Sequence, residues 1–136
     1  MQQDIKTMKA EDVMASPVLC CLTNTSLKTI ADKLATTKYH GIPIINENQE
    51  LVGIITEKNV LQALTQGKNL ASTLAEEVMS FPVVTAERQS MLSAIINVMM
   101  EKDITRVVII ENNKAVGIVS QHDIVKKLKK DDFVEL

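Results

Sequence analysis

Two stretches of this sequence end an apolar, glycine-bearing run with a hydroxyl residue and then continue in a helical pattern. They are Gly53–Asn59 and Gly117–Asp123. The first N–H groups of a helix lack intrahelical partners and carry the positive end of the helix dipole, so they stabilise a nearby anion such as phosphate. The hydroxyl of Ser120 or Thr56 can donate one more bond. The pattern therefore indicates an anion site at each strand-to-helix junction.

A second polar residue follows each hydroxyl at a distance of three positions. Asp123 falls about one turn beyond Ser120 on nearly the same face, where a carboxylate can accept hydrogen bonds from two neighbouring ribose hydroxyls. Asn59 stands at the equivalent place after Thr56, and it can do this only in part because half of its amide donates. Phosphate at the hydroxyl and ribose at the carboxylate together favour a nucleotide.

The same pattern has an interpretation without any ligand. Ser-x-x-Asp before an apolar helix is also a capping box, which stabilises the helix start by itself. Against this, Gly53 and Gly117 each stand three positions before the hydroxyl, and the missing side chain would let another group approach the strand. Ligand site and capping box both remain open at this point.

The junction occurs twice because the chain repeats itself. Ala10–Met14 recurs 65 positions later as Ala75–Met79, and Leu51–Thr56 recurs 64 positions later as Ala115–Ser120. We expect one repeat over residues 1–67 and a second over 68–136, with a break at Gln66–Asn69. Half of this length would be marginal alone, so the two repeats should form one module.

Each repeat reads as β-α-β-β-α, a mixed α/β (α+β) class. A short extended piece is expected at 18–21 and at 83–85, and a helix with an i, i+3, i+4, i+7 apolar stripe follows each. Thr25 and Ser90 are predicted as the N-caps of these helices. The stripes are Leu27, Ile30, Ala31 and Leu34 in the first repeat and Leu92, Ile95, Ile96 and Met99 in the second.

Two paired strands and a closing helix complete each repeat. The predicted strands are 41–45 with 51–56 and 106–110 with 115–120, and Asn112–Asn113 suits a tight hairpin turn. The closing helices should run from Glu57 to about Leu64 and from Gln121 to about Lys129. Their predicted buried residues are Val60, Leu61 and Leu64 in the first and Ile124, Val125 and Leu128 in the second.

Composition predicts a soluble, folded protein, with 46% apolar and 24% charged residues. No apolar run is long enough to span a bilayer and the start, Met1–Asp4, does not resemble a signal peptide, so a cytoplasmic location without membrane contact is expected. A net charge of −2 and only three aromatic residues, Tyr39, Phe81 and Phe133, argue against nucleic acid as a partner. The lysines of 126–130 precede Asp131–Asp132 and indicate a solvated helix end.

No catalytic or metal constellation is recognisable in the sequence. Cys20 and Cys21 are adjacent inside an apolar stretch, which suits neither a disulfide nor a zinc site and predicts core residues. His40 and His122 lack accompanying carboxylates, and paired carboxylates are missing for acid-base chemistry. We therefore expect no enzymatic activity, no catalytic residue and no metal.

The order of these motifs resembles a cystathionine-β-synthase-type (CBS) domain pair from about Ala10 to Leu128. The matching segments are 12–14, 17–18, 41–44 and 51–56 in the first repeat, and 77–79, 82–83, 106–109 and 116–123 in the second. The resemblance implies that the repeats pack sheet to sheet about a pseudo-two-fold axis. It also implies two clefts, which in the family bind AMP, ADP, ATP or S-adenosylmethionine.

The resemblance further implies which residues meet the ligand. In one cleft Ser120 would meet phosphate and Asp123 ribose, with the adenine lined by Thr85, Thr105, Arg106 and Val107. In the other cleft the corresponding residues would be Thr56, Asn59, Tyr39, His40, Gly41, Ile42 and Cys20. The basic residues Lys58, His122 and Arg106 would reach phosphate, or else are solvated surface residues. The chain departs from the family pattern where Asn59 replaces the acid and where Val108 replaces the proline that matches Pro43.

The function expected from these features is regulatory. An adenosine-containing ligand would bridge the repeats and shift the equilibrium of a regulated partner protein or of an oligomer, without any cofactor. The alternative is a ligand-free interaction module that dimerises through leftover apolar helix faces, and family members commonly form flat dimers. Both interpretations predict a homodimer.

Overall fold

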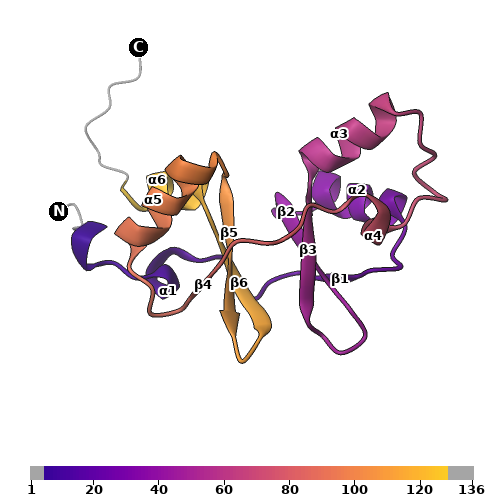
Figure 1. Cartoon of the computed structure of the whole chain (residues 1–136). Helices are drawn as coiled ribbons and strands as arrows, with labels where there is room; N and C mark the ends of the chain where they lie inside the picture. Colours follow the sequence, from indigo (N-terminus) through magenta and orange to yellow (C-terminus); the bar gives the residue numbers. More distant parts are fainter. Residues whose placement is uncertain (1–4, 129–136) are drawn as a thin grey trace, which may run out of the picture. The chain divides into compact units, whose positions relative to one another are not determined.

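The computed structural model describes residues 5–128 (Figure 1). Each repeat contributes a short leading helix, a first strand, a long helix, a strand pair and a closing helix, so the predicted α+β class and β-α-β-β-α order are confirmed. After a 3-10 turn at Ile5–Thr7, the elements are α1 Ala10–Val13, β1 Cys21–Leu22, α2 Leu27–Thr36, β2 Gly41–Ile45, β3 Leu51–Thr56, α3 Glu57–Thr65, α4 Ala75–Val78, β4 Thr85–Glu87, α5 Leu92–Lys102, β5 Arg106–Glu111, β6 Lys114–Ser120 and α6 Gln121–Lys127.

The strands form two three-stranded sheets, ordered β1-β2-β3 and β4-β5-β6. The first strand of each repeat pairs in parallel with the second, as Cys21 opposite Ile44 and Thr85 opposite Val108 show. β2 and β3 are antiparallel, with Gly41 opposite Thr56. This register places the start of β2 beside the end of β3, where the candidate junction begins.

The compact units of the fold and the repeats of the sequence divide the chain differently. Unit 1 holds the described residues up to Ser16, then 85–111, then the described residues from Val116. Unit 2 holds 17–84 with the hairpin tip 112–115. The segment that opens each repeat is therefore packed with the core of the other repeat.

Backbone hydrogen bonds hold these exchanged segments in place. In unit 1 the N–H of Ala10 donates to Ser90 O at 2.9 Å, and Ala15 forms a bridge with Ile118. In unit 2 the N–H of Ala75 donates to Thr25 O at 2.8 Å, and Ser80 forms a bridge with Ile54. α1 therefore lies near β4 and α5, and α4 lies near α2 and β3 (Figure 1).

The core of each unit is built from the long helix and the strands. The fully buried residues include Leu27, Ile30, Ile42, Ile44, Ile55 and Ala75 in unit 2 and Ala10, Leu92, Val107, Val108, Ile109 and Val119 in unit 1. Burying one large aliphatic side chain contributes roughly 1.5–3 kcal/mol to stability. The junctions are thus carried on strands whose apolar residues are firmly anchored.

Several local predictions are confirmed. Asn112 and Asn113 have φ values of 53° and 63°, as a two-residue hairpin turn requires, and Gly67 has φ 75° just beyond the end of α3. The predicted end of α6 at Lys129, with Lys130, Asp131–Asp132, Phe133 and Met1–Asp4, lies outside the described residues.

The predicted N-caps were wrong by one residue. The cap of α2 is Ser26, whose Oγ accepts the N–H of Thr29 at 3.2 Å, and α5 begins after Met91 without a side-chain cap. Ser90 instead closes the preceding turn, because its Oγ accepts the N–H of Glu87 at 2.9 Å. The first strands also begin later than predicted, at Cys21 and Thr85, where a partner strand is available.

The buried faces of the closing helices also differ from the prediction. Leu61, Leu64 and Val125 are 60%, 50% and 66% exposed. The positions buried in α3 are Asn59, Val60 and Ala63. Val60 and Ile124 are buried as predicted, and Asn59 joins the buried face of α3 through hydrogen bonds to residues outside its own helix, as described below.

Candidate functional site

The Ser120 junction, residues Ser120–Asp123 of unit 1, forms a complete capping box. The N–H of Asp123 donates to Ser120 Oγ at 3.0 Å, and Asp123 Oδ2 accepts from Ser120 Oγ at 2.8 Å and from Ser120 N at 3.3 Å. Within residues 5–128 the other carboxylate oxygen, Oδ1, accepts no hydrogen bond, and Asp123 is only half-buried. One oxygen of the carboxylate is therefore not used by the capping box.

The helix start at this junction offers fewer free amides than the sequence suggested. The N–H of Gln121 donates to Thr105 O at 3.0 Å, and the N–H of Asp123 is used by the box. The Gln121 side chain also donates to Ile104 O at 3.3 Å. Of the amides of residues 121–123, only that of His122 has no hydrogen-bond partner in the described part of the chain.

The segment before β5 is drawn to the Ser120 junction by these bonds. Thr105 is exposed and its Oγ1 accepts from Arg106 Nη1 at 2.8 Å. Val107 is fully buried, so its role is to hold the strand and it offers no surface to a ligand. Thr85 is exposed on β4, and no hydrogen bond joins it to the junction within residues 5–128.

The Thr56 junction, residues Thr56–Asn59 of unit 2, has a different arrangement. Asn59 Oδ1 accepts from Thr56 N at 2.9 Å and from Thr56 Oγ1 at 3.3 Å. Its Nδ2 donates to Val78 O at 3.1 Å and to Ser80 Oγ at 3.0 Å. Asn59 is 7% exposed. Every hydrogen-bonding position of this side chain is satisfied inside the protein.

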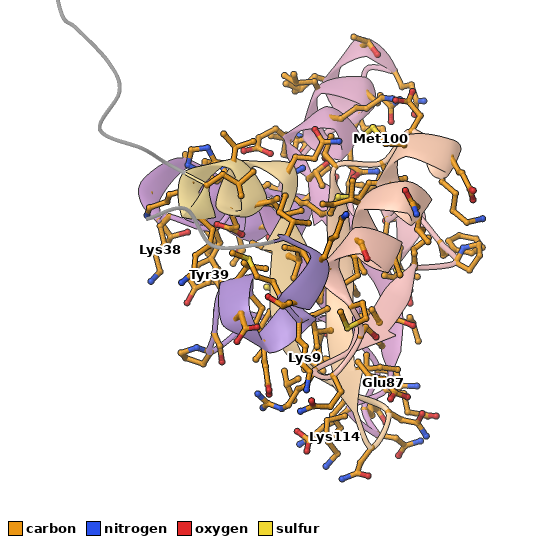
Figure 2. All side chains as sticks on the ribbon, turned by 90° about the vertical axis from the view of Figure 1, so that its left-hand side faces the viewer. Lys9, Lys38, Tyr39, Glu87, Met100 and Lys114 are labelled. Atoms are coloured by element: carbon orange, nitrogen blue, oxygen red, sulfur yellow. The ribbon has the colours of Figure 1, made fainter. Side chains whose placement is uncertain are left out.

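The other residues predicted around the Thr56 junction have mixed positions. His40 Nδ1 lies 3.3 Å from Glu57 Oε2, and both side chains are about half exposed or more. Tyr39 donates its hydroxyl to Pro17 O at 3.2 Å, and Lys38 Nζ lies 5.9 Å from the Tyr39 ring centroid (Figure 2). Lys58 is exposed, whereas Gly41 and Ile42 are buried, and Ile42 has no exposed surface for a ligand.

The room beside the two glycines is taken by methionines. A Cβ on Gly53 would stand 2.3 Å from Met79 Sδ, and a Cβ on Gly117 would stand 2.6 Å from Met14 Sδ. The glycines do permit a close approach, as predicted, but in this structure the approaching group is a side chain from the exchanged segment. They therefore no longer count in favour of a ligand.

The cysteines and histidines gather no reactive site. Burial, reinforced by the neighbouring Cys21, raises the pKa of the Cys20 thiol, and burial also raises the pKa of Cys21. Both thiols are therefore protonated near neutral pH and poorly nucleophilic. No group of three metal-ligating side chains is found among the residues that the structure describes, and none of its helices has the length and apolarity of a membrane span.

A comparison with protein families gives the decisive observation. The CBS domain model matches residues 10–66 and again residues 75–130. The chain belongs to the CBS-domain family. The resemblance inferred from the sequence motifs is confirmed, including its occurrence twice.

Two solved structures are similar to this chain over most of its length. A solved CBS domain pair, that of protein MJ0100 in complex with 5′-methylthioadenosine and S-adenosyl-L-methionine, is 28% identical, covers 88% of this chain and 94% of its own, and has a TM-score of 0.81. Hypoxic Response Protein I, solved with two coordinated zinc ions, is 25% identical with a TM-score of 0.78, over 90% of this chain and 100% of its own.

A curated relative, the uncharacterized protein MK0525 of Methanopyrus kandleri, is 34% identical over 110 residues. The match covers 77% of this chain and 56% of that protein, so the chain spans about half of its length. The L-aspartate semialdehyde sulfurtransferase of Methanocaldococcus jannaschii is 30% identical over 84% of this chain but only 22% of the enzyme. The activity of that enzyme is thus a property of a much longer chain.

Sequence reasoning missed several residues that shape the site. Gln121 and Ser80 fasten the junctions through their side chains, and Met14 and Met79 fill the space beside the glycines. The sequence did contain a signal for the methionines. Met14 and Met79 are 65 positions apart and Gly53 and Gly117 are 64 apart, so each repeat carries one methionine and one glycine at equivalent places. Nothing in the sequence indicated that each methionine meets the glycine of the other repeat.

Proposed function

We propose that this CBS-domain chain is a non-catalytic regulatory module that binds an adenosine-containing ligand, AMP, ADP, ATP or S-adenosylmethionine, at the Ser120 junction. The observation that carries the proposal is the half-buried Asp123 carboxylate, which keeps Oδ1 for a ribose diol while Oδ2 fixes its orientation. The solved CBS pair that holds S-adenosyl-L-methionine and 5′-methylthioadenosine supports this ligand class.

The remaining contacts of the proposed site come from the same unit. The N–H of His122, which has no hydrogen-bond partner within residues 5–128, and the hydroxyl of Ser120 would meet a phosphate. The hydroxyl would do so by turning away from Asp123 Oδ2. Thr105, Arg106 and Thr85 would line the base. The buried Val107 is not part of the contact surface. A ligand that binds one conformation more tightly than another would shift an oligomer or partner equilibrium.

The test is titration calorimetry of the whole chain with each of the four ligands at millimolar concentration. We expect heat with at least one of them, and none with Asp123→Ala, because the diol acceptor is removed. Loss of the cap contact should cost only about 1 kcal/mol of folding free energy, so the variant stays folded. Asp32→Ala, which removes an exposed acid from α2 and changes the net charge equally, should bind like the wild type.

Two outcomes would end this proposal. Absence of heat with all four ligands for the folded wild type leaves the capping box as the whole role of Ser120 and Asp123. Undiminished binding by folded Asp123→Ala would place the ligand elsewhere.

A second function is favoured by a specific observation, and we propose it beside the first. Leu61 and Leu64 lie three positions apart on α3 and are 60% and 50% exposed. Residues three positions apart on a helix are neighbours, so the two leucines form one exposed apolar patch, and exposed apolar patches mark interaction sites. Self-association of this chain into a homodimer through α3 would bury them, with or without a ligand.

A further inference from the structure

Asn59 in unit 2 and Asp123 in unit 1 stand at equivalent places in the two repeats. Asn59 Nδ2 donates to Val78 O and Ser80 Oγ, whereas Asp123 Oδ1 accepts no hydrogen bond within residues 5–128. We infer that only the Ser120 junction takes a ligand, that the chain therefore binds one equivalent, and that Asn59 together with Ser80 closes the Thr56 junction. This inference rests on the function proposed above and adds the stoichiometry and the residues that set it.

The hydrogen bonds of Asn59 carry the first step. An amide side chain has two donor hydrogens and an oxygen with two lone pairs. Oδ1 accepts twice from Thr56, and Nδ2 donates to Val78 O and to Ser80 Oγ. A diol at this place would have to break one of these bonds on a side chain that is only 7% exposed. Loss of a buried hydrogen bond opposes binding, so the satisfied hydrogen bonds of Asn59 close the junction.

The internal duplication provides a matched comparison within one chain. Asn59 corresponds to Asp123, and Ser80 corresponds to Ala15, 65 positions earlier. Ala15 has no hydroxyl, and a carboxylate has no hydrogen with which to reach the carbonyl of Val13, the counterpart of Val78. Asn59 and Ser80, which we call the closed pair, are joined by a hydrogen bond between their side chains. Asp123 and Ala15, the open pair at the equivalent places, differ from them at both positions and cannot form this bond.

The closed pair also locks the exchanged segment of unit 2. Ser80 bridges to Ile54 of β3 through the backbone, and its Oγ receives the Asn59 amide, so one residue joins the strand to the helix that follows it. In unit 1, Ala15 makes the same backbone bridge to Ile118. Within the described residues, no side-chain hydrogen bond ties Asp123 to that segment.

The experiment measures binding stoichiometry by calorimetry with AMP, ADP, ATP and S-adenosylmethionine, on four forms of the full chain. We expect one equivalent for the wild type and none for Asp123→Asn. For Asn59→Asp combined with Ser80→Ala we expect two equivalents, since the new carboxylate is freed from Ser80 and can turn to a diol. Adding Asp123→Asn to that double variant should return the stoichiometry to one.

The outcomes separate this inference from the function on which it rests. No binding by the wild type overturns the proposed function and this inference with it. Two equivalents on the wild type, or one equivalent retained by Asp123→Asn, leave a ligand-binding function standing and overturn the assignment to the Ser120 junction. A folded Asn59→Asp, Ser80→Ala variant that still binds one equivalent overturns the role of Asn59. If that variant does not fold, the comparison of the wild type with Asp123→Asn still decides between one site and two.

Discussion

A carboxylate and a carboxamide have nearly the same shape, and at the residue scale the difference in what they donate separates the two junctions. Asp123 accepts hydrogen bonds from Ser120 through Oδ2, and its Oδ1 accepts none within residues 5–128. Asn59 instead donates from Nδ2 to Val78 O and to Ser80 Oγ. The hydroxyls before them differ as well. Ser120 Oγ accepts the N–H of Asp123 at 3.0 Å and donates to Asp123 Oδ2 at 2.8 Å, while the Thr56 hydroxyl donates to Asn59 Oδ1 at 3.3 Å.

The hydrogen bonds of the Ser120 hydroxyl, at 2.8 and 3.0 Å, are shorter than the 3.3 Å bond of the Thr56 hydroxyl, so we expect removal of the Ser120 hydroxyl to cost more stability. Ser120→Ala leaves the N–H of Asp123 without its cap, which should lower the free energy of unfolding by about 1 kcal/mol. Thr56→Ala, the matched control, loses a longer hydrogen bond between side chains and should cost less. Urea unfolding followed by circular dichroism measures both, with unchanged m values as the sign that only stability changed. An equal or larger loss in Thr56→Ala would show that the two hydroxyls play the same structural role.

At the scale of elements, the periodicity of the sequence predicted well wherever one face of an element is buried. The bounds of β2 and β3 and the start of both closing helices agree with the structure, because the glycine-bearing strands and the hydroxyl that follows them are strong local signals. The burial of Asn59 in α3 was not predictable, since its amide hydrogen-bonds to Val78 and Ser80, some twenty residues away. The site was predictable as a junction, while the state of each hydrogen bond was not.

Met79, the residue after α4, packs against Gly53 of β3, so we expect substitutions at these two positions to affect stability together. A methyl group on Gly53 would stand 2.3 Å from Met79 Sδ and 2.9 Å from Met79 Cβ, so Gly53→Ala should destabilise the chain by about 1–3 kcal/mol. Met79→Ala in the same chain should recover part of that loss, which a double-mutant cycle by thermal or urea unfolding would measure.

Gly67→Ala is the control for this cycle. Gly67 has φ 75° with nothing near its missing Cβ, so the cost there is backbone strain alone and should not respond to Met79→Ala. Additive effects of Gly53→Ala and Met79→Ala would contradict the packing of the methionine against the glycine.

At the scale of the whole molecule, neither repeat of the sequence forms a compact unit alone. Each unit takes its opening segment from one repeat and its sheet from the other, joined by backbone bonds such as Ala10 to Ser90 and Ala75 to Thr25. A change at one junction therefore acts on a unit to which both repeats contribute. The surface left over includes the outer side of α3, where Leu61 and Leu64 have no place in the core of unit 2.

We expect the exposed leucines of α3 to form the contact of a homodimer. Replacing Leu61 and Leu64 together by Gln should raise the dissociation constant of the dimer by at least about a hundredfold, because about 1.5–3 kcal/mol is lost for each buried leucine and each 1.4 kcal/mol is tenfold. Sedimentation equilibrium over a range of protein concentrations measures the change. Met100→Gln alters an equally exposed side chain on α5 and should leave the dimer as it is. A wild-type chain that sediments as a monomer at all concentrations would remove the interaction function, and a dimer unaffected by the double change would place its interface on another face.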